Sequence, residues 1–204
     1  MKNLFKKLTR MQWLAIALII LGVAIMFPRA RGMLDFYKEA RYAAENDFAS
    51  GDVSPDLLRP WMSIRYVAVA YAVPQQYLFD AANIKPRKET SMVSIQRLNQ
   101  KMGLGQVDGE PALLKTVRAA IAAYRADPVA TGLLEKRVEG WMTAQYVANS
   151  TGIAVDVILA AANIPANGNI HKPFDFLSEE LNYPGGPTAL VKAVQDFLEQ
   201  EEQP

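Results

Sequence analysis

The sequence predicts an all-α protein in which an N-terminal transmembrane helix precedes a soluble helical region built from two similar repeats. Two observations lead to this prediction. Residues 11–27 form a long apolar run without charge, and a 24-residue segment recurs after a spacing of 80 residues. The chain has 204 residues, of which 50% are hydrophobic, so it can bury a sizeable core.

These features divide the chain into four predicted segments. They are a cytoplasmic basic arm with the transmembrane helix (1–28), a juxtamembrane helix and linker (29–56), helical repeat 1 (57–127) and helical repeat 2 (128–204).

The predicted membrane helix reads MQWLAIALIILGVAIMF and contains no charged residue. As an α-helix this run is about 25 Å long, which is adequate to contact membrane lipids across most of a bilayer core. Pro28 then ends the helix before Arg29 and Arg31. A cleaved signal peptide is the main alternative, but the apolar run is longer than usual and no small-residue cleavage site precedes the arginines.

The arm before this helix indicates the orientation. It carries Lys2, Lys6, Lys7 and Arg10 and no acidic residue. Because basic arms are retained on the cytoplasmic side, we expect a single-pass protein of the cell membrane with its soluble region outside the cytoplasm. Basic residues beyond the helix, from Arg29 to Arg41, reduce this asymmetry.

The repeat aligns Trp61–Ile84 with Trp141–Ile164 without a gap, and nine of the 24 positions are identical. Such internal similarity is typical of duplicated structural units. We assign six of the identical residues to the structural core of the repeats: Trp61, Tyr66, Asn83, Trp141, Tyr146 and Asn163.

Similarity continues after this segment. Leu98 and Asn99 match Leu181 and Asn182, each pair preceding two glycines, and proline-started helices follow at Pro111 and Pro187. Each repeat is therefore predicted to contain four short helices.

Local signals define the first two helices of each repeat. Ser63 and Thr143 are typical N-caps. The first helix should end at Ala72 or Gly152, in a turn that requires a left-handed backbone. The second helix should end at Ala82 or Ala162, and the asparagine that follows each alanine suits the position just past a helix end.

The order of a small alanine, a tight turn and a second apolar helix resembles a helix-turn-helix unit, in both copies. In DNA-binding members of that class the second helix presents polar and basic side chains to the major groove. Here this helix contains no lysine or arginine, and Gln75 and Gln76 are replaced by Val155 and Asp156 in the second copy. A nucleic-acid partner is therefore disfavoured.

The segment LeuPheAspAlaAlaAsnIle, residues 78–84, also resembles the helical middle of a peptidoglycan-binding LysM module. That module requires a strand on each side of its helices. The flanking residues, Arg59 and Pro60 before and Lys85 to Glu89 after, show no alternating strand pattern.

No catalytic, cofactor-binding or metal-binding residue is predicted. The chain has no cysteine, and His171 is its only histidine. Glu179 and Glu180 are adjacent and point in different directions on a helix, unlike paired catalytic carboxylates. Glycine-rich phosphate loops and serine-nucleophile motifs are missing. We therefore expect a non-enzymatic protein without cofactor or small-molecule substrate.

The two repeats differ in net charge. Residues 57–127 carry ten basic and five acidic groups, whereas residues 128–204 carry four basic and ten acidic groups. The simple interpretation is two solvated faces of opposite sign. The alternative is that Arg87, Lys88, Arg97 and Lys101 bind an acidic partner surface or anionic lipid head groups.

Together these features predict a membrane-anchored adaptor, an accessory or assembly subunit of a bacterial membrane protein complex that binds partners through its helical repeats. A membrane-bound helix-turn-helix regulator and a cell-wall binding protein remain as alternatives.

Overall fold

A computed structural model of the protein describes residues 41–42, 45–46, 48, 53–131 and 137–201. Residues 1–45 and 46–204 form two separate units. In the first unit, Arg41 and Glu45 form an ion pair of 2.7 Å one helical turn apart. The predicted basic arm and membrane helix, residues 1–28, lie outside the described residues. In the parts of the chain that are described, no helix is both long enough and apolar enough to cross a membrane.

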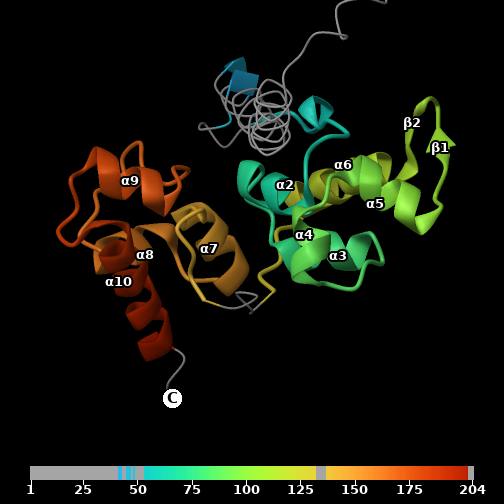
Figure 1. The fold of residues 1–204 in the computed structure, drawn as a ribbon. Helices are drawn as coiled ribbons and strands as arrows, with labels where there is room; N and C mark the ends of the chain where they lie inside the picture. The colour runs from blue at the N-terminus through green and yellow to red at the C-terminus, as the bar shows by residue number, and fades with distance from the viewer. Residues whose placement is uncertain (1–40, 43–44, 47, 49–52, 132–136, 202–204) are drawn as a thin grey trace, which may run out of the picture. The chain divides into compact units, whose positions relative to one another are not determined.

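The described residues are mostly helical, which confirms the all-α prediction in its broad form (Figure 1). The 3₁₀ helix η3 (Pro55–Leu57) leads into the first repeat. That repeat contains five α-helices, here given with their bounds: α2 (Ile64–Ala70), α3 (Gln75–Ala81), α4 (Lys88–Met92), α5 (Ile95–Met102) and α6 (Ala112–Ala126). The second contains α7 (Ala144–Thr151), α8 (Val155–Ala161), α9 (Phe174–Glu180) and α10 (Gly186–Glu201). Four helices per repeat is thus correct for the described part of the second repeat, while α4 is additional in the first.

The predicted caps form in both repeats. The Ser63 hydroxyl accepts the backbone N–H of Tyr66 at 3.1 Å, and the Thr143 hydroxyl accepts that of Tyr146 at the same distance. Each bond satisfies an amide that the first turn of a helix would otherwise leave without a partner. The starts of α2 and α7 are therefore specified by the same local chemistry.

The predicted left-handed turns also form. Ala72, two residues after the end of α2, has φ 50°, and Gly152, directly after α7, has φ 82°. Asn83 and Asn163, with φ 52° and 56°, end α3 and α8. After each asparagine the next N–H returns to the helix, from Ile84 to Phe79 at 2.8 Å in the first copy. This six-to-one bond closes the helix end and turns the chain sharply.

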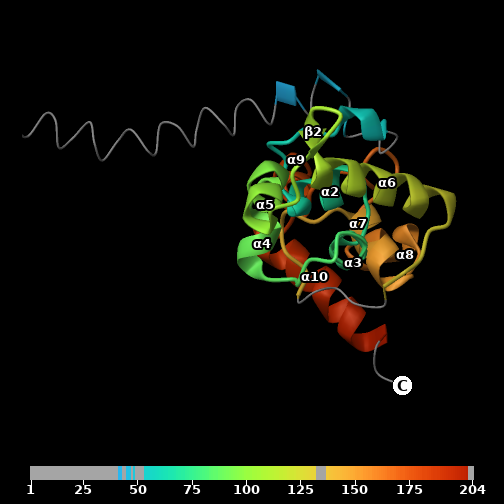
Figure 2. The same cartoon turned by 90° about the vertical axis from the view of Figure 1, so that its right-hand side faces the viewer.

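Helix packing follows the same scheme in both repeats. In the first repeat α3 and α5 pack on α6, and in the second α8 and α9 pack on α10. Both views place α6 alongside α5 (Figures 1 and 2). Leu113, Val117 and Ile121 are buried on the inner side of α6, and Leu190, Val194 and Leu198 recur at the same spacing on α10.

The positions of α5 and α9 show that the predicted alignment of the two repeats is wrong after the 24-residue segment. The N–H of Ile95 binds the carbonyl of Met62 at 2.8 Å, and the N–H of Phe174 binds that of Met142 at 2.9 Å. Ile95 therefore corresponds to Phe174, which makes Leu177 and Ser178 the partners of Leu98 and Asn99. The predicted match of Leu98 and Asn99 to Leu181 and Asn182 is therefore wrong by four residues, or about one helical turn. Such a shift is easy to make from sequence, because apolar residues on one side of a helix recur every three or four positions.

A short hairpin separates α5 from α6 in the first repeat, whereas the described residues between α9 and α10 form no strand. Strands β1 (Gln106–Val107) and β2 (Glu110–Pro111) pair in antiparallel fashion, and Asp108 and Gly109 between them both have positive φ. Figure 1 shows the hairpin projecting beyond the helices. An Asp-Gly pair is the usual sequence signal for such a turn.

Each repeat also contains a single antiparallel bridge that flanks its first helices. Ser63 pairs with Ser94, and Thr143 pairs with Pro173. The N-cap residue of α2 therefore lies beside that of α5, and the N-cap residue of α7 lies beside that of α9. A bridge of one residue pair is too short to produce the alternation of apolar and polar residues that predicts a strand.

The segment before η3 packs on the first repeat. Phe48 and Val53 are buried, and the ring of Phe48 lies 5.8 Å from that of Tyr71, edge to face. The Tyr71 hydroxyl donates to the carbonyl of Ser54 at 3.2 Å.

Candidate functional site

Of the six residues assigned to the repeat core, only Tyr146 is fully enclosed. It is 2% exposed, whereas Trp61 is 37% exposed. The rings of Trp61 and Tyr66 lie 5.3 Å apart, and those of Trp141 and Tyr146 lie 5.7 Å apart, so the pair recurs at equivalent places. Trp61 therefore contacts Tyr66 edge to face while its own ring stays partly exposed.

The two asparagines of this set are exposed rather than buried. Their left-handed backbone at the ends of α3 and α8 accounts for their recurrence, since asparagine tolerates that conformation better than most residues. Their role is to end a helix.

Side-chain contacts connect the described parts of the two repeats, among them a hydrogen bond that the Tyr124 hydroxyl donates to the carbonyl of Asn149 at 3.4 Å. The Asn149 side-chain amide donates to the carbonyl of Ala72 at 2.5 Å, and the guanidinium of Arg65 lies 4.2 Å from the ring centre of Trp141. A cation over an indole face is attracted by the negative potential of the ring. The left-handed turn of the first repeat thus also provides an acceptor for the second.

The four predicted partner-binding residues lie on two helices. Arg97 and Lys101 are one turn apart on α5, so they lie on one face of that helix, and both are exposed. Arg87 and Lys88 belong to the start of α4, which packs on α2. Arg87 is exposed, and its backbone N–H donates to Thr90 Oγ1 at 2.9 Å.

The correspondence between Ile95 and Phe174 makes α5 and α9 directly comparable. We call the outer residues of the first helix the α5 face: Gln96, Arg97, Gln100, Lys101 and Met102. Their counterparts form the α9 face: Asp175, Phe176, Glu179, Glu180 and Leu181. All ten side chains are exposed.

The two faces differ in charge at equivalent positions. Lys101 corresponds to Glu180, and Gln100 corresponds to Glu179. The α5 face carries two basic residues and no acid, whereas the α9 face carries three acids and no base. Lys172 lies beside the α9 face and binds Glu180 at 2.6 Å, which neutralises one of the three.

Apolar exposure is common to the two faces. Met102 is 38% exposed and its counterpart Leu181 is 40% exposed, while Phe176 on the α9 face is 54% exposed. Single exposed apolar side chains are common on protein surfaces, but here they recur at equivalent positions beside charges that differ in sign between the two faces. The two faces are therefore our candidate site.

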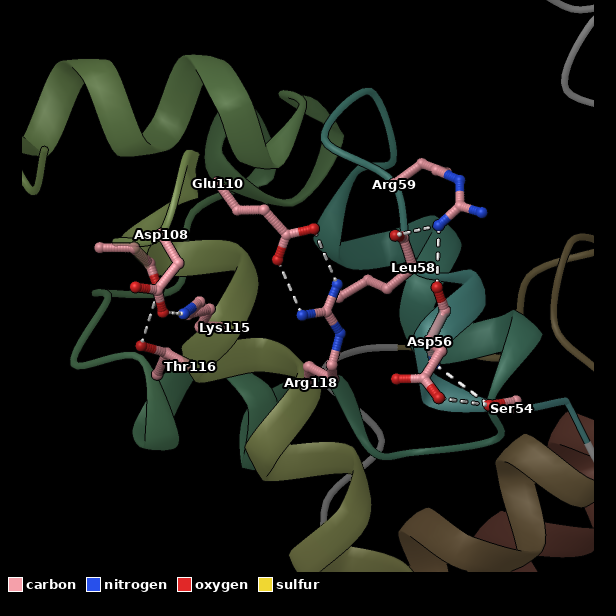
Figure 3. A network of polar contacts seen from close by, with 10 residues as sticks. Ser54, Asp56, Leu58, Arg59, Asp108, Glu110, Lys115, Thr116 and Arg118 are labelled. Atoms are coloured by element: carbon pink, nitrogen blue, oxygen red, sulfur yellow. Dashed lines mark hydrogen bonds and ion pairs between the residues drawn. The ribbon is translucent and has the colours of Figure 1, made fainter. Parts of the chain in front are cut away.

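A second charged cluster lies where the hairpin meets α6 (Figure 3). Lys115 binds the carboxylate of Asp108, and Arg118 binds that of Glu110 at 2.9 Å. Hydrogen bonding from these cations lowers the pKa of both carboxyl groups, and the bond to Glu110 raises the pKa of Arg118.

Beside this cluster is an open hollow of about 420 Å³, lined by Pro55, Asp56, Lys115, Arg118, Ala119 and Ala122. Arg59 lies near Asp56 in the same view and donates to its carbonyl at 2.8 Å (Figure 3). Because Lys115 and Arg118 are each paired with a carboxylate, the hollow offers little net charge to a ligand. The hydrogen bonds tie the hairpin to the helix.

Metal binding finds no support in the described part of the chain, where no three His, Asp or Glu side chains are grouped closely enough to hold an ion. His171 lies in the turn before α9, and burial lowers its pKa.

The residues considered for base recognition are not arranged for it. Gln75 is 2% exposed, so its side chain does not reach outward. The neighbouring Gln76 donates to Asp80 at 2.8 Å on the same helix.

Comparison with known proteins adds no relationship, since no family model, no curated protein and no solved structure matches this chain.

Proposed function

We propose that the protein is a membrane-anchored, non-enzymatic adaptor: an accessory or assembly subunit of a membrane protein complex that binds protein partners through its helical repeats. The α5 and α9 faces are the binding surfaces. In this proposal, residues 11–27 are the anchor, and the two repeats arose by duplication of one helical unit.

The main support for the proposal is the difference between the basic residues at the hairpin and those on the α5 face. At the hairpin, Lys115 and Arg118 are each paired with a carboxylate. On the α5 face, Arg97 and Lys101 stand beside the exposed Met102, with no acidic residue among the face's own side chains. Unpaired charge beside apolar surface is what a protein partner can use, since the charges guide association and the apolar atoms supply affinity.

The anchor supports the same function. The run at 11–27 has no charged residue and the arm before it is basic, a combination that favours retention of the N-terminus in the cytoplasm. The repeats would then act at the outer side of the membrane, where a tethered helical module increases the local concentration of whatever it binds.

Labelling tests the topology. The natural chain has no cysteine, so Asn3→Cys and Gln100→Cys each introduce a single thiol. We expect a membrane-impermeant maleimide to label Gln100→Cys in intact cells and Asn3→Cys only after permeabilisation. The reverse pattern, or release of the chain by carbonate washing, contradicts this arrangement.

Crosslinking in the native membrane tests the adaptor function. A photoreactive amino acid at Gln100 or Glu179 probes the two faces, and the exposed Ala81 and Ala160 on α3 and α8 serve as matched controls. We expect reproducible protein adducts from the faces and few from the controls. Equal adduct patterns at all four positions would contradict binding through these surfaces.

A second candidate function is cell-wall binding. It is favoured by the bridges between Ser63 and Ser94 and between Thr143 and Pro173, which place a strand-like residue before and after the helices that resemble a LysM module. Sedimentation of the full chain with purified peptidoglycan tests this candidate. Loss of sedimentation in Gly152→Val, with retention in the face variant Arg97→Glu, would support glycan binding by the module.

A further inference from the structure

The two faces of the candidate site are complementary to each other. At equivalent positions, Lys101 is replaced by Glu180 and Gln100 by Glu179, while Met102 and Leu181 retain an exposed apolar side chain. Charge is inverted at the position of Lys101, and the counterpart of Arg97 is the apolar Phe176. As whole surfaces, the α5 face is basic and the α9 face is acidic, and both keep exposed apolar side chains.

We propose that the α5 face of one copy of this protein binds the α9 face of a second copy. This inference rests on the proposed function, because it identifies the partner of those same faces. Arg97 and Lys101 would meet Glu179 and Asp175, and Met102 would pack near Phe176.

Charge is the reason for choosing a second copy as the partner. The α5 face has two positive charges, and the α9 face retains two negative charges after Lys172 pairs with Glu180. An anionic membrane surface would attract the first face but repel the second. A contact between copies gives both faces a partner of opposite sign.

The strength of the contact follows from its exposure. Ion pairs at a solvent-exposed rim contribute little individually and are screened by salt. The apolar side chains must therefore supply much of the affinity, and association should be weak and sensitive to salt. Confinement to one membrane compensates by raising the effective concentration of the chains.

The geometry of such a contact is heterologous, because two different surfaces meet. A pair joined by one contact leaves one α5 face and one α9 face available. Two copies close into a dimer if both contacts form together, and otherwise a row of copies extends along the membrane.

Charge reversal in the full chain provides the test. Arg97→Glu with Lys101→Glu makes both faces acidic, and Glu179→Lys with Glu180→Lys makes both faces basic. We expect each double variant alone to associate at least about tenfold more weakly than the natural chain in sedimentation velocity at low salt. A mixture of the two variants should associate again, as should the quadruple variant, because opposite faces meet in both cases.

Matched controls change net charge by the same amount elsewhere. Lys85→Glu with Arg137→Glu, and Asp127→Lys with Glu199→Lys, alter exposed residues outside the two faces. They should retain the association of the natural chain. Circular dichroism checks that each variant keeps the helical content of the natural chain. Recovery of association in the mixture is a second check, because unfolded variants would not regain it when mixed.

Several results would overturn the inference. They are a natural chain that stays monomeric at membrane densities, controls that lose association as the face variants do, or a mixture that fails to recover. If Gln100 crosslinks to a different protein while the chain stays monomeric, the adaptor function stands and self-association fails. If crosslinking finds no protein at either face, both proposals fail. If Arg97→Glu with Lys101→Glu weakens only binding to anionic vesicles, the α5 face binds lipid instead.

Discussion

The side-chain amide of Asn99 holds the first turn of α6 by accepting the backbone N–H of Leu113 at 2.9 Å. Its nitrogen donates to the carbonyl of Gly105 at 2.7 Å, so one buried side chain fixes both sides of the hairpin insertion. In the second repeat the corresponding residue is Ser178, and the described residues that link α9 to α10 contain no hairpin.

Replacing this amide should destabilise the protein. Asn99→Ala leaves a buried N–H without its acceptor, and such a loss typically lowers the free energy of unfolding by about 1–3 kcal/mol. Urea unfolding of the full chain in detergent measures it. Gln100→Ala, at the exposed neighbouring position, is the control and should change stability by less than about 0.5 kcal/mol. Equal effects of the two substitutions would show that the amide bonds contribute nothing.

Substitutions of Gly152, in the left-handed turn after α7, should lower stability by amounts that depend on the new side chain. Gly152 has φ 82°, and a Cβ there would meet the Ala130 Cβ at an ordinary 3.4 Å. Backbone strain rather than collision should therefore determine the effect. Gly152→Ala should cost about 1 kcal/mol of stability. Gly152→Asn should cost less and Gly152→Val more, because asparagine tolerates this conformation and a β-branched residue does not. A different order in thermal unfolding would refute the explanation.

The pairs between hairpin and α6 should control local opening rather than global stability. Arg118→Gln removes the ion pair with Glu110. Because the carboxylate is exposed, the global unfolding midpoint should hardly change. Backbone hydrogen exchange at residues 106–111 should accelerate, whereas exchange in α10 should not. An unchanged exchange rate in the hairpin would mean that β1–β2 is held by other contacts.

This local protection should depend on acidity in a defined direction. The bond from Arg118 lowers the pKa of Glu110 below its usual 4.5. Its stabilising effect is therefore complete above pH 4.5 and is lost as the pH falls through the lowered value. Protection from exchange should therefore decrease in the natural chain as the pH falls across this range, and Glu110→Gln should reduce the dependence to the part that the Asp108–Lys115 pair contributes.

His171 predicts a separate effect at higher pH. Burial lowers its pKa below the usual 6.5. The unfolded chain then binds the proton first, so stability is full above pH 6.5 and declines as the pH falls from there toward the lowered value. Unfolding midpoints at several pH values in this range measure the decline. His171→Gln should flatten that part of the curve. If it does not, another group is responsible.

Local chemistry explains what the sequence could predict. The N-caps Ser63 and Thr143 and the turn residues Ala72 and Gly152 act through bonds within a few residues of themselves. Their signals are therefore visible in a short stretch of sequence. Net charge per repeat was visible as well, because it needs only counting.

Contacts between distant residues explain what the sequence could not predict. The role of Asn99 depends on Leu113, fourteen positions away. The register of α9 depends on a backbone bond from Phe174 to Met142, which has no side-chain signature. Without that register, the opposite charges of Lys101 and Glu180 could not be assigned to equivalent positions.

The brevity of the helices has a consequence for experiments. Most have seven or eight residues, as α2 and α7 do, and helices of that length do not persist alone in water. Each depends on neighbours for its existence, so removing one should dissolve the repeat to which it belongs. Deletion mapping would accordingly report loss of folding wherever the deletion is made. Only single substitutions of exposed side chains can distinguish loss of partner binding from loss of folding.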